Sequence, residues 1–194
     1  MVDYATGNPP VLGGVIDADR MGTALLHADA NQTRLETWRR VGAADTFFSE
    51  LLPYAAVDVT GNSSAALVRT SDGAVHAFGN DFSPPAAAMP SAAIAMGLSF
   101  AVSLHRDSGA LVAWGTEGRF SEPVDGAYDL LVANMTNLWA RHRDTRELRL
   151  WEQAGEVLSP LAVTAGIGPV TTCVPIEDYR DGALVATDAG RVLV

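Results

Sequence analysis

Short apolar runs of four to six residues, separated by polar turns, recur along the chain. Residues 92–114 show the unit clearly, with apolar runs at Ala92–Met96, Phe100–Leu104 and Ala110–Trp114. Runs of this length that are rich in Val, Leu and aromatic residues, and bounded by Gly and Asp, predict β-strands. The runs are continuously apolar, and this pattern indicates sheets that are covered on both faces.

The unit is an internal repeat. Each copy ends on an aromatic residue, and residues 63–79 align with residues 99–115 without a gap. A fifth copy, Gly182–Val194, stops one residue short of its aromatic. Repeats of 36–40 residues that each form a small antiparallel sheet predict a β-propeller. The aligned aromatics are Trp38, Phe78, Trp114 and Trp151.

We therefore predict an all-β protein, a single propeller domain of about five short blades over residues 1–194. The fifth copy lacks its outermost strand, and an unpaired strand edge promotes aggregation. We expect the N-terminal segment Val2–Asn8 to close the propeller by pairing with Gly190–Val194, which puts Tyr4 near the missing aromatic. A free N-terminus and a longer array are the alternatives. The predicted repeats cover approximately residues 13–54, 55–91, 92–128, 129–167 and 168–194.

Two copies carry a family motif. "IAMGLSFAVSLHRDSGALVAWG" (94–115) and "VDVTGNSSAALVRTSDGAVHAFG" (57–79) resemble the regulator of chromosome condensation repeat, and 15–38 and 131–151 follow it loosely. The resemblance covers about residues 13–194 and implies a β-propeller. That family includes exchange factors, enzyme inhibitors and scaffolds, and it usually has seven blades. The repeat length is similar to that of a bacterial β-lactamase inhibitor propeller protein.

Composition narrows the classes of partner. The net charge is −10, with an isoelectric point near 4.6, which argues against a nucleic-acid partner because phosphate backbones attract clustered cations. No apolar run reaches the roughly 18–20 residues of a membrane helix. The first residues, "MVDYATGNPPVLGG", do not predict a signal peptide, so a cytoplasmic location is the default expectation. Cys173 is the single cysteine, and we expect a buried structural thiol.

The residues with catalytic or metal-binding potential have structural interpretations. The aligned aromatics could form a ligand cage, but large rings at a fixed strand position are typical of packing between blades. His27, His105 and His142 share one repeat position, which Arg69 takes in the second copy. Propeller symmetry separates these histidines, so they cannot share a metal ion, and we expect hydrogen bonds at strand ends. The sequence predicts no cofactor and no metal site.

Two other segments are ambiguous. Asp19, Asp178 and Asp181 are the only acidic candidates for a glycoside hydrolase, and we expect them to be solvated turn residues. Residues 47–54, "FFSELLPY", are expected to connect two repeats, with a short helical turn as one possibility and packing on a blade flank as another.

The loop after the first strand of each copy is the candidate binding site. The strands around it are alike, whereas its first residue differs in every copy, so the five loops can build an asymmetric face on a symmetric scaffold. We predict a non-catalytic protein-binding propeller that acts as an inhibitor, adaptor or complex subunit, with a protein partner. A lectin-like propeller, and after it a glycoside hydrolase, are the alternatives. The predicted binding residues are Arg20, Met21, Asn62, Leu98, Met135, Tyr179 and Arg180.

Overall fold

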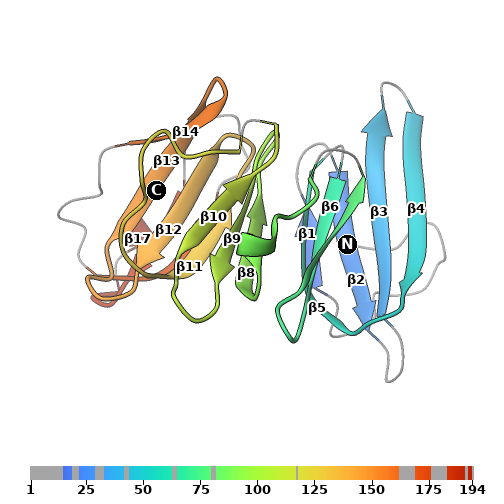
Figure 1. Ribbon diagram of the computed structural model, residues 1–194, viewed down its shortest axis with the longest axis horizontal. Helices are drawn as coiled ribbons and strands as arrows, with labels where there is room; N and C mark the ends of the chain where they lie inside the picture. The colour runs from blue at the N-terminus through green and yellow to red at the C-terminus, as the bar shows by residue number, and fades with distance from the viewer. Residues whose placement is uncertain are drawn as a thin grey trace.

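The protein is all-β. The computed structural model describes residues 15–18, 22–28, 33–41, 44–62, 65–79, 82–116, 118–161, 169–175, 183–190 and 192–193. Within these residues the chain forms five antiparallel sheets and one short 3-10 helix, η1 (Ala86–Ala88) (Figure 1). The predicted fold class is confirmed.

Each sheet is a run of consecutive strands, as the repeat predicts. The first sheet contains β1 (Val15–Ala18), β2 (Gly22–Ala28), β3 (Thr33–Val41) and β4 (Ala44–Leu52). The second contains β5 (Ala56–Gly61), β6 (Ala65–Thr70) and β7 (Val75–Gly79), and the third β8 (Ser91–Met96), β9 (Ala101–His105) and β10 (Leu111–Trp114). The fourth contains β11 (Tyr128–Ala133), β12 (Asn137–His142), β13 (Leu148–Ala154) and β14 (Val157–Pro160). The fifth contains β15 (Val170–Pro175), β16 (Ala183–Thr187) and β17 (Val192–Leu193).

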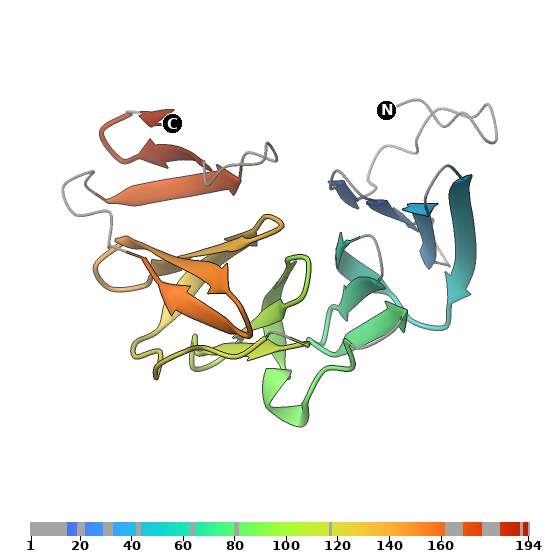
Figure 2. The same ribbon diagram turned by 90° about the horizontal axis from the view of Figure 1, so that it is seen from above.

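The sheets follow one another around an arc, with the first and the fifth sheet at its two ends (Figure 2). The first strand of each sheet lies innermost and contacts the first strand of the next, in the order β1, β5, β8, β11 and β15. The predicted closing segment, Val2–Asn8 with Tyr4, lies outside the described residues. Closure of the propeller by that segment therefore stays a prediction.

The apolar core lies between neighbouring sheets. Leu35 of the first sheet packs with Val68 of the second, and Leu67 of the second packs with Met96 of the third. The same arrangement continues between the third and fourth sheets and between the fourth and fifth. The middle strands β6, β9 and β12 are therefore buried on both faces, and this explains why their sequences are continuously apolar.

In the second, third and fourth sheets, a tight turn between the second and third strands contacts the next sheet. Its last residue has a positive φ, at Gly73 (+91°), Gly109 (+72°) and Arg146 (+62°). The carbonyl oxygen of that residue accepts a hydrogen bond from the first residue of the following sheet. These bonds run from the N–H of Ser91, Tyr128 and Val170, with N···O distances of 2.8, 2.8 and 3.0 Å.

The turn in the second sheet is one residue shorter than in the third. The N–H of Thr70 donates to the carbonyl of Ala74, whereas the N–H of His105 donates to the carbonyl of Ala110. The gapless alignment of these two copies is therefore wrong by one residue before the turn. Thr70, and not Arg69, is the equivalent of His105.

The corrected register reveals a repeated ion pair. Arg69 on β6 contacts Asp58 on β5 at 3.3 Å, and Arg141 at the equivalent position of β12 contacts Asp129 on β11 at 2.7 Å. Arg141 is 9% exposed, and its guanidinium also donates to the backbone carbonyls of Val170 and Thr171 in the fifth sheet. The arginine thus ties the fourth sheet to the fifth, because charge-assisted bonds to carbonyls satisfy a buried cation.

Residues 44–52 form a fourth strand and not a simple connection. The helical turn that was one possibility for this segment does not form over β4, because β4 pairs with β3 along its whole length. Phe48 and Leu51 are 45% and 48% exposed, so the expected packing of these two side chains on a blade flank is wrong as well. As the outermost strand of its sheet, β4 pairs with no further strand among the described residues.

Cys173 is a buried structural thiol, as expected. It is 3% exposed and packs with Trp139 and Val185 between the fourth and fifth sheets. Burial raises the pKa of the thiol from 9.0 to about 12, because a low-dielectric environment disfavours the thiolate. We predict that an aromatic disulfide reagent at pH 8 labels the folded protein far more slowly than the urea-unfolded one. Equal labelling rates would show that the thiol is accessible.

Candidate functional site

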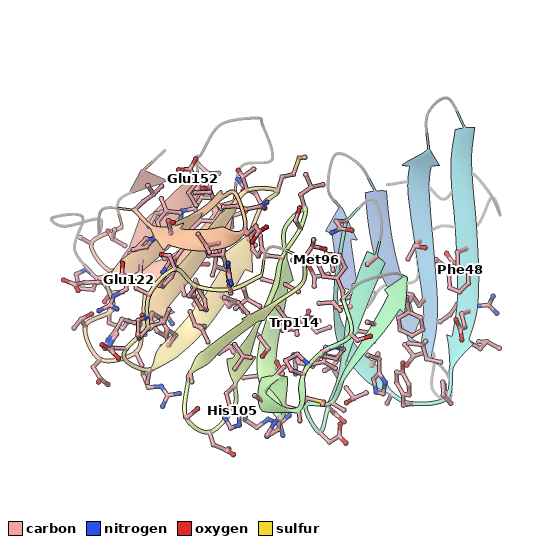
Figure 3. The ribbon with its side chains drawn as sticks, turned by 45° about the horizontal axis from the view of Figure 1, so that its top comes forward. Phe48, Met96, His105, Trp114, Glu122 and Glu152 are labelled. Carbon is pink, nitrogen blue, oxygen red and sulfur yellow. The ribbon has the colours of Figure 1, made fainter. Side chains whose placement is uncertain are left out.

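The repeated aromatics pack between sheets and do not form a ligand cage. Trp114 on β10 is 7% exposed, contacts the second and third sheets, and donates from Nε1 to the carbonyl of Phe82 at 2.8 Å (Figure 3). Trp151 on β13 is buried between the third and fourth sheets, and Phe78 packs between the first and second. The side chain of Trp38 lies outside the described part of the structure.

Two of the described histidines, His105 and His142, stabilise turns. Nδ1 of His105 accepts a hydrogen bond from the N–H of Ser108 at 3.4 Å, and Nδ1 of His142 accepts from Asp144 and Thr145 at 3.3 and 3.4 Å. This is the strand-end hydrogen bonding that the sequence predicts. His27 belongs to β2, and its side chain lies outside the described residues.

Asn62 has a structural position in the loop face. It is 5% exposed, and its Nδ2 donates to the carbonyls of Gly97 and Leu98 at 2.8 and 3.0 Å. Its backbone N–H donates to the carbonyl of Ala65, three residues later. The backbone N–H groups of Gly97 and Asn134, the first residues of the next two loops, donate in the same way to residues three positions later. The shift by one residue therefore places Asn62 at the start of its loop. It fixes the neighbouring loop in position.

Leu98 and Met135 occupy equivalent positions in the next two loops. The N–H of Leu98 donates to the carbonyl of Met135 at 2.8 Å. Together with Asn62, this bond joins the loops of the second, third and fourth sheets into one row. The Leu98 side chain is 40% exposed and that of Met135 is half-buried. The row lies at one end of the sheets. In the third sheet, Met96 directly precedes the loop and lies at that end, whereas His105 lies at the opposite end (Figure 3).

The structure thus brings together three of the seven predicted binding residues. Arg20, Met21, Tyr179 and Arg180 lie outside the described residues, as do Asp19, Asp178 and Asp181. For these positions the sequence predictions remain as they stand.

The opposite end of the sheets carries arginines that the sequence reasoning did not assign. Nη2 of Arg106 donates to the carbonyl of Ser71 in the preceding turn at 2.9 Å. Nη2 of Arg143, at the equivalent position one sheet later, donates to the carbonyl of Tyr128 at 3.5 Å. The repeated "HRD" at 105–107 and 142–144 is the signal in the sequence. The Arg106 bond links two neighbouring turns, and the Arg143 bond ties its turn to the first strand of its own sheet, so this end has a structural role.

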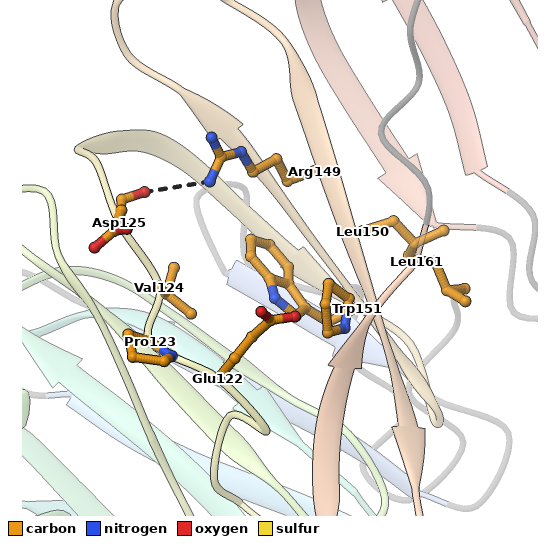
Figure 4. Close-up of a pocket in the computed structure, with 9 residues that line it drawn as sticks. Glu122, Pro123, Val124, Asp125, Arg149, Leu150, Trp151 and Leu161 are labelled. Atoms are coloured by element: carbon orange, nitrogen blue, oxygen red, sulfur yellow. Dashed lines mark hydrogen bonds between the residues drawn. The ribbon is translucent and has the colours of Figure 1, made fainter.

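A pocket of about 260 Å³ lies on the outer side of the fourth sheet (Figure 4). It is formed between β13 and the connection that runs past Phe120, which bridges to Leu158. Trp151 lines the pocket but is only 3% exposed, and the Arg149 guanidinium donates to the Tyr128 hydroxyl at 2.9 Å and to the carbonyl of Asp125 at 3.3 Å. Because the Arg149 guanidinium is engaged within the protein and Trp151 is almost fully buried, we assign no ligand to this pocket.

The described residues offer neither a metal-binding cluster nor a membrane-spanning helix. Among them there is no group of three or more His, Cys, Asp or Glu side chains that could hold a metal ion. In the same part of the chain, no helix is long and apolar enough to cross a membrane.

Comparison with known proteins identifies the fold. No family model matches the chain, and no curated protein matches it by sequence. Among solved structures, human WBSCR16 matches with a TM-score of 0.63 at 12% identity, over 91% of this chain and 60% of that one. Prp20p from Saccharomyces cerevisiae gives a TM-score of 0.60 at 12% identity, over 92% of this chain and 56% of that one.

A plant protein shows the same likeness. The ectodomain of the Physcomitrella patens receptor kinase CR4 matches with a TM-score of 0.62 at 12% identity, over 96% of this chain and 55% of that one. This chain therefore spans between about half and three fifths of the length of the solved structures it matches. At this level of identity the likeness shows the fold alone: the chain adopts a β-propeller fold of the regulator of chromosome condensation type.

Proposed function

We propose that this chain is a non-catalytic protein-binding propeller, which acts as an inhibitor, adaptor or complex subunit through the loop face. The observation that carries the proposal is Leu98. An apolar side chain that is 40% exposed stands on a loop whose backbone is held on both sides, by Asn62 and by Met135. A rigid loop that presents an apolar group loses little entropy on binding, and this favours its use as an interface anchor.

The structural relatives support the class of function. One solved structure shows yeast RCC1 (Prp20) bound to Kap60, and another describes the binding of Prp20p to Gsp1p and histones. Similar scaffolds thus serve protein recognition. The inhibitor role is also the one suggested by the similar repeat length of the bacterial β-lactamase inhibitor propeller. We further propose that residues 1–194 act as one domain and that Tyr179 and Arg180 extend the loop face.

The first experiment identifies a partner and maps it. The tagged full chain is used for affinity capture, captured proteins are identified by mass spectrometry, and the affinity of each purified candidate is measured by calorimetry. We expect Leu98→Asp, Tyr179→Ala and Arg180→Ala each to weaken binding about thirtyfold, the effect of losing roughly 2 kcal/mol at a central interface residue. The melting temperature should barely change, since exposed loop substitutions usually cost less than about 0.5 kcal/mol.

The control lies at the other end of the sheets. Asp107 is an exposed residue in the turn after His105, and Asp107→Ala should leave the affinity unchanged. If all the variants bind as tightly as the unmodified chain, the binding site is not the loop face.

A further inference from the structure

The fifth sheet is buried on one face only. In β16, Ala183, Val185 and Thr187 are buried, whereas Leu184 between them is exposed and Ala186 is half-buried. Successive residues of a strand point to opposite faces of its sheet. The buried residues pack toward the fourth sheet, so the face that carries Leu184 points away from it.

The register shows how this face is covered in the other sheets. Thr187 pairs with the first residue of its sheet, as do Thr70, His105 and His142. Counting back three residues places Leu184 in the position of Leu67, Val102 and Trp139. Those side chains are 0%, 0% and 3% exposed, because the next sheet covers each of them, whereas Leu184 is 41% exposed.

The exposed face extends across two strands. Val174 on β15 lies directly opposite Leu184 and is 54% exposed. The equivalent residues Thr60 and Ala95 are 7% and 4% exposed, and the equivalent Val132 of the fourth sheet is half-buried. An apolar cross-strand pair thus stands in solvent at a place where the other sheets are covered.

The turn of the fifth sheet supplies an independent observation. Gly190 donates to the carbonyl of Thr187 just as Gly73 and Gly109 donate to Thr70 and His105, and all three glycines have positive φ. A Cβ added at Gly73 or Gly109 would lie 2.8 Å from backbone atoms of the next sheet. At Gly190 no described atom lies within 4 Å. The turn of the fifth sheet therefore has the geometry for contacting a following sheet, but no described residue occupies its contact position.

We propose that this open face binds the first sheet of a second copy of this chain, head to tail. The contact would repeat the one that the chain already makes between its own consecutive sheets, in which the following sheet supplies an aromatic residue such as Trp114 or Trp151. The first copy of the repeat has Trp38 at that position. Within one molecule the first and fifth sheets lie at opposite ends of the arc (Figure 2). The proposed contact is therefore the alternative to closure within one molecule by Val2–Asn8, because both arrangements use the same two sheets.

Such a contact joins two different surfaces. A head-to-tail interface builds a closed ring or an open chain of copies, depending on the rotation between neighbours. Two copies that meet through identical fifth sheets would instead form a symmetric dimer. The two arrangements bury different strands and so slow amide hydrogen exchange in different strands. This difference allows them to be distinguished.

Sedimentation velocity over a concentration series tests the association. We expect the full chain to form species larger than the monomer, and Leu184→Asp and Val174→Asp each to raise the dissociation constant about thirtyfold or more. Leu161→Asp is the matched control, because Leu161 is 38% exposed at the end of the fourth sheet, and it should associate normally. Two separate variants are used so that misfolding of one, visible in its circular dichroism, does not decide the result.

Hydrogen exchange on the full chain identifies the second surface. On association we expect slower amide exchange in β15 and β16 and also in β1–β3, with β9 unchanged. Protection of β15 and β16 alone would indicate a symmetric dimer and overturn the proposal. The proposal would also be overturned if the chain stays monomeric at all concentrations. The same holds if Leu184→Asp and Val174→Asp leave the dissociation constant unchanged.

Discussion

Replacing Gly109 by alanine is expected to destabilise the folded protein by about 2–5 kcal/mol. Gly109 has a φ of +72°, where an L-residue costs roughly 1–2 kcal/mol. The added Cβ would also lie 2.8 and 2.9 Å from the backbone oxygen and nitrogen of Tyr128, the first residue of the fourth sheet. The methyl group therefore pushes the fourth sheet away from the third, and overpacking of this kind adds about 1–3 kcal/mol.

A second glycine separates these two effects. Gly155 has a φ of +62°, but no described atom lies within 4 Å of an added Cβ. Gly155→Ala should therefore cost only the backbone term of roughly 1–2 kcal/mol. Urea unfolding of both variants gives the comparison. Equal losses of unfolding free energy would show that the contact between the turn of β9–β10 and Tyr128 contributes nothing to stability.

Replacing Trp114 by alanine should lower the free energy of unfolding by about 3–5 kcal/mol, a large effect for the truncation of a single side chain. The indole is 7% exposed and fills the space between the second and third sheets, where it contacts residues such as Leu67 and Met96. Its loss leaves a cavity and also leaves the carbonyl of Phe82 without the 2.8 Å hydrogen bond from Nε1. The measurement is the free energy of unfolding from denaturant titration.

Two variants resolve the origin of this loss. Trp114→Phe keeps most of the ring but removes the donor, so it should cost about 1–3 kcal/mol, the usual penalty for leaving a buried carbonyl unsatisfied. Phe48→Ala removes a ring that is 45% exposed on β4 and should cost less than about 1 kcal/mol, since little apolar surface returns to water. A Trp114→Ala protein as stable as Phe48→Ala would show that the aromatic position does not hold the sheets together.

Much of the fold could be predicted because its signals are local. The length and composition of the apolar runs fix strands, and the period of the aromatics fixes one sheet per repeat. Continuous rather than alternating apolarity indicates burial on both faces, as the structure shows for β6 and β9. The structural roles of Trp114 and Trp151 followed from the same argument, because a large ring recurring at one strand position fills the same space in each copy.

The predictions that were wrong concern features that depend on the length of one turn or on the unpaired edge of a sheet. A turn shorter by one residue at 71–73 moved Asn62 and Thr70 relative to their expected equivalents, although the residue types aligned well. The apolar "FFSELL" satisfies the same local rules as a buried run, but β4 is the outermost strand of its sheet. Hydrophobicity alone does not distinguish an outer strand from an inner one.

The sequence by itself determined the strands, the repeat and the all-β class, since these depend on neighbours along the chain. Only the tertiary structure decided which residues meet across sheets: the row of loops joined through Asn62 and Leu98, the arginine ties between turns, and the exposure of Leu184. Asn62 and Gly97 are 35 residues apart, and their bond exists because two sheets are placed side by side at a fixed angle. Leu184 and Leu67 have similar neighbours along the chain, yet Leu184 is exposed and Leu67 is buried. The residue type does not decide this difference, because the burial of a side chain depends on what packs against its face of the sheet.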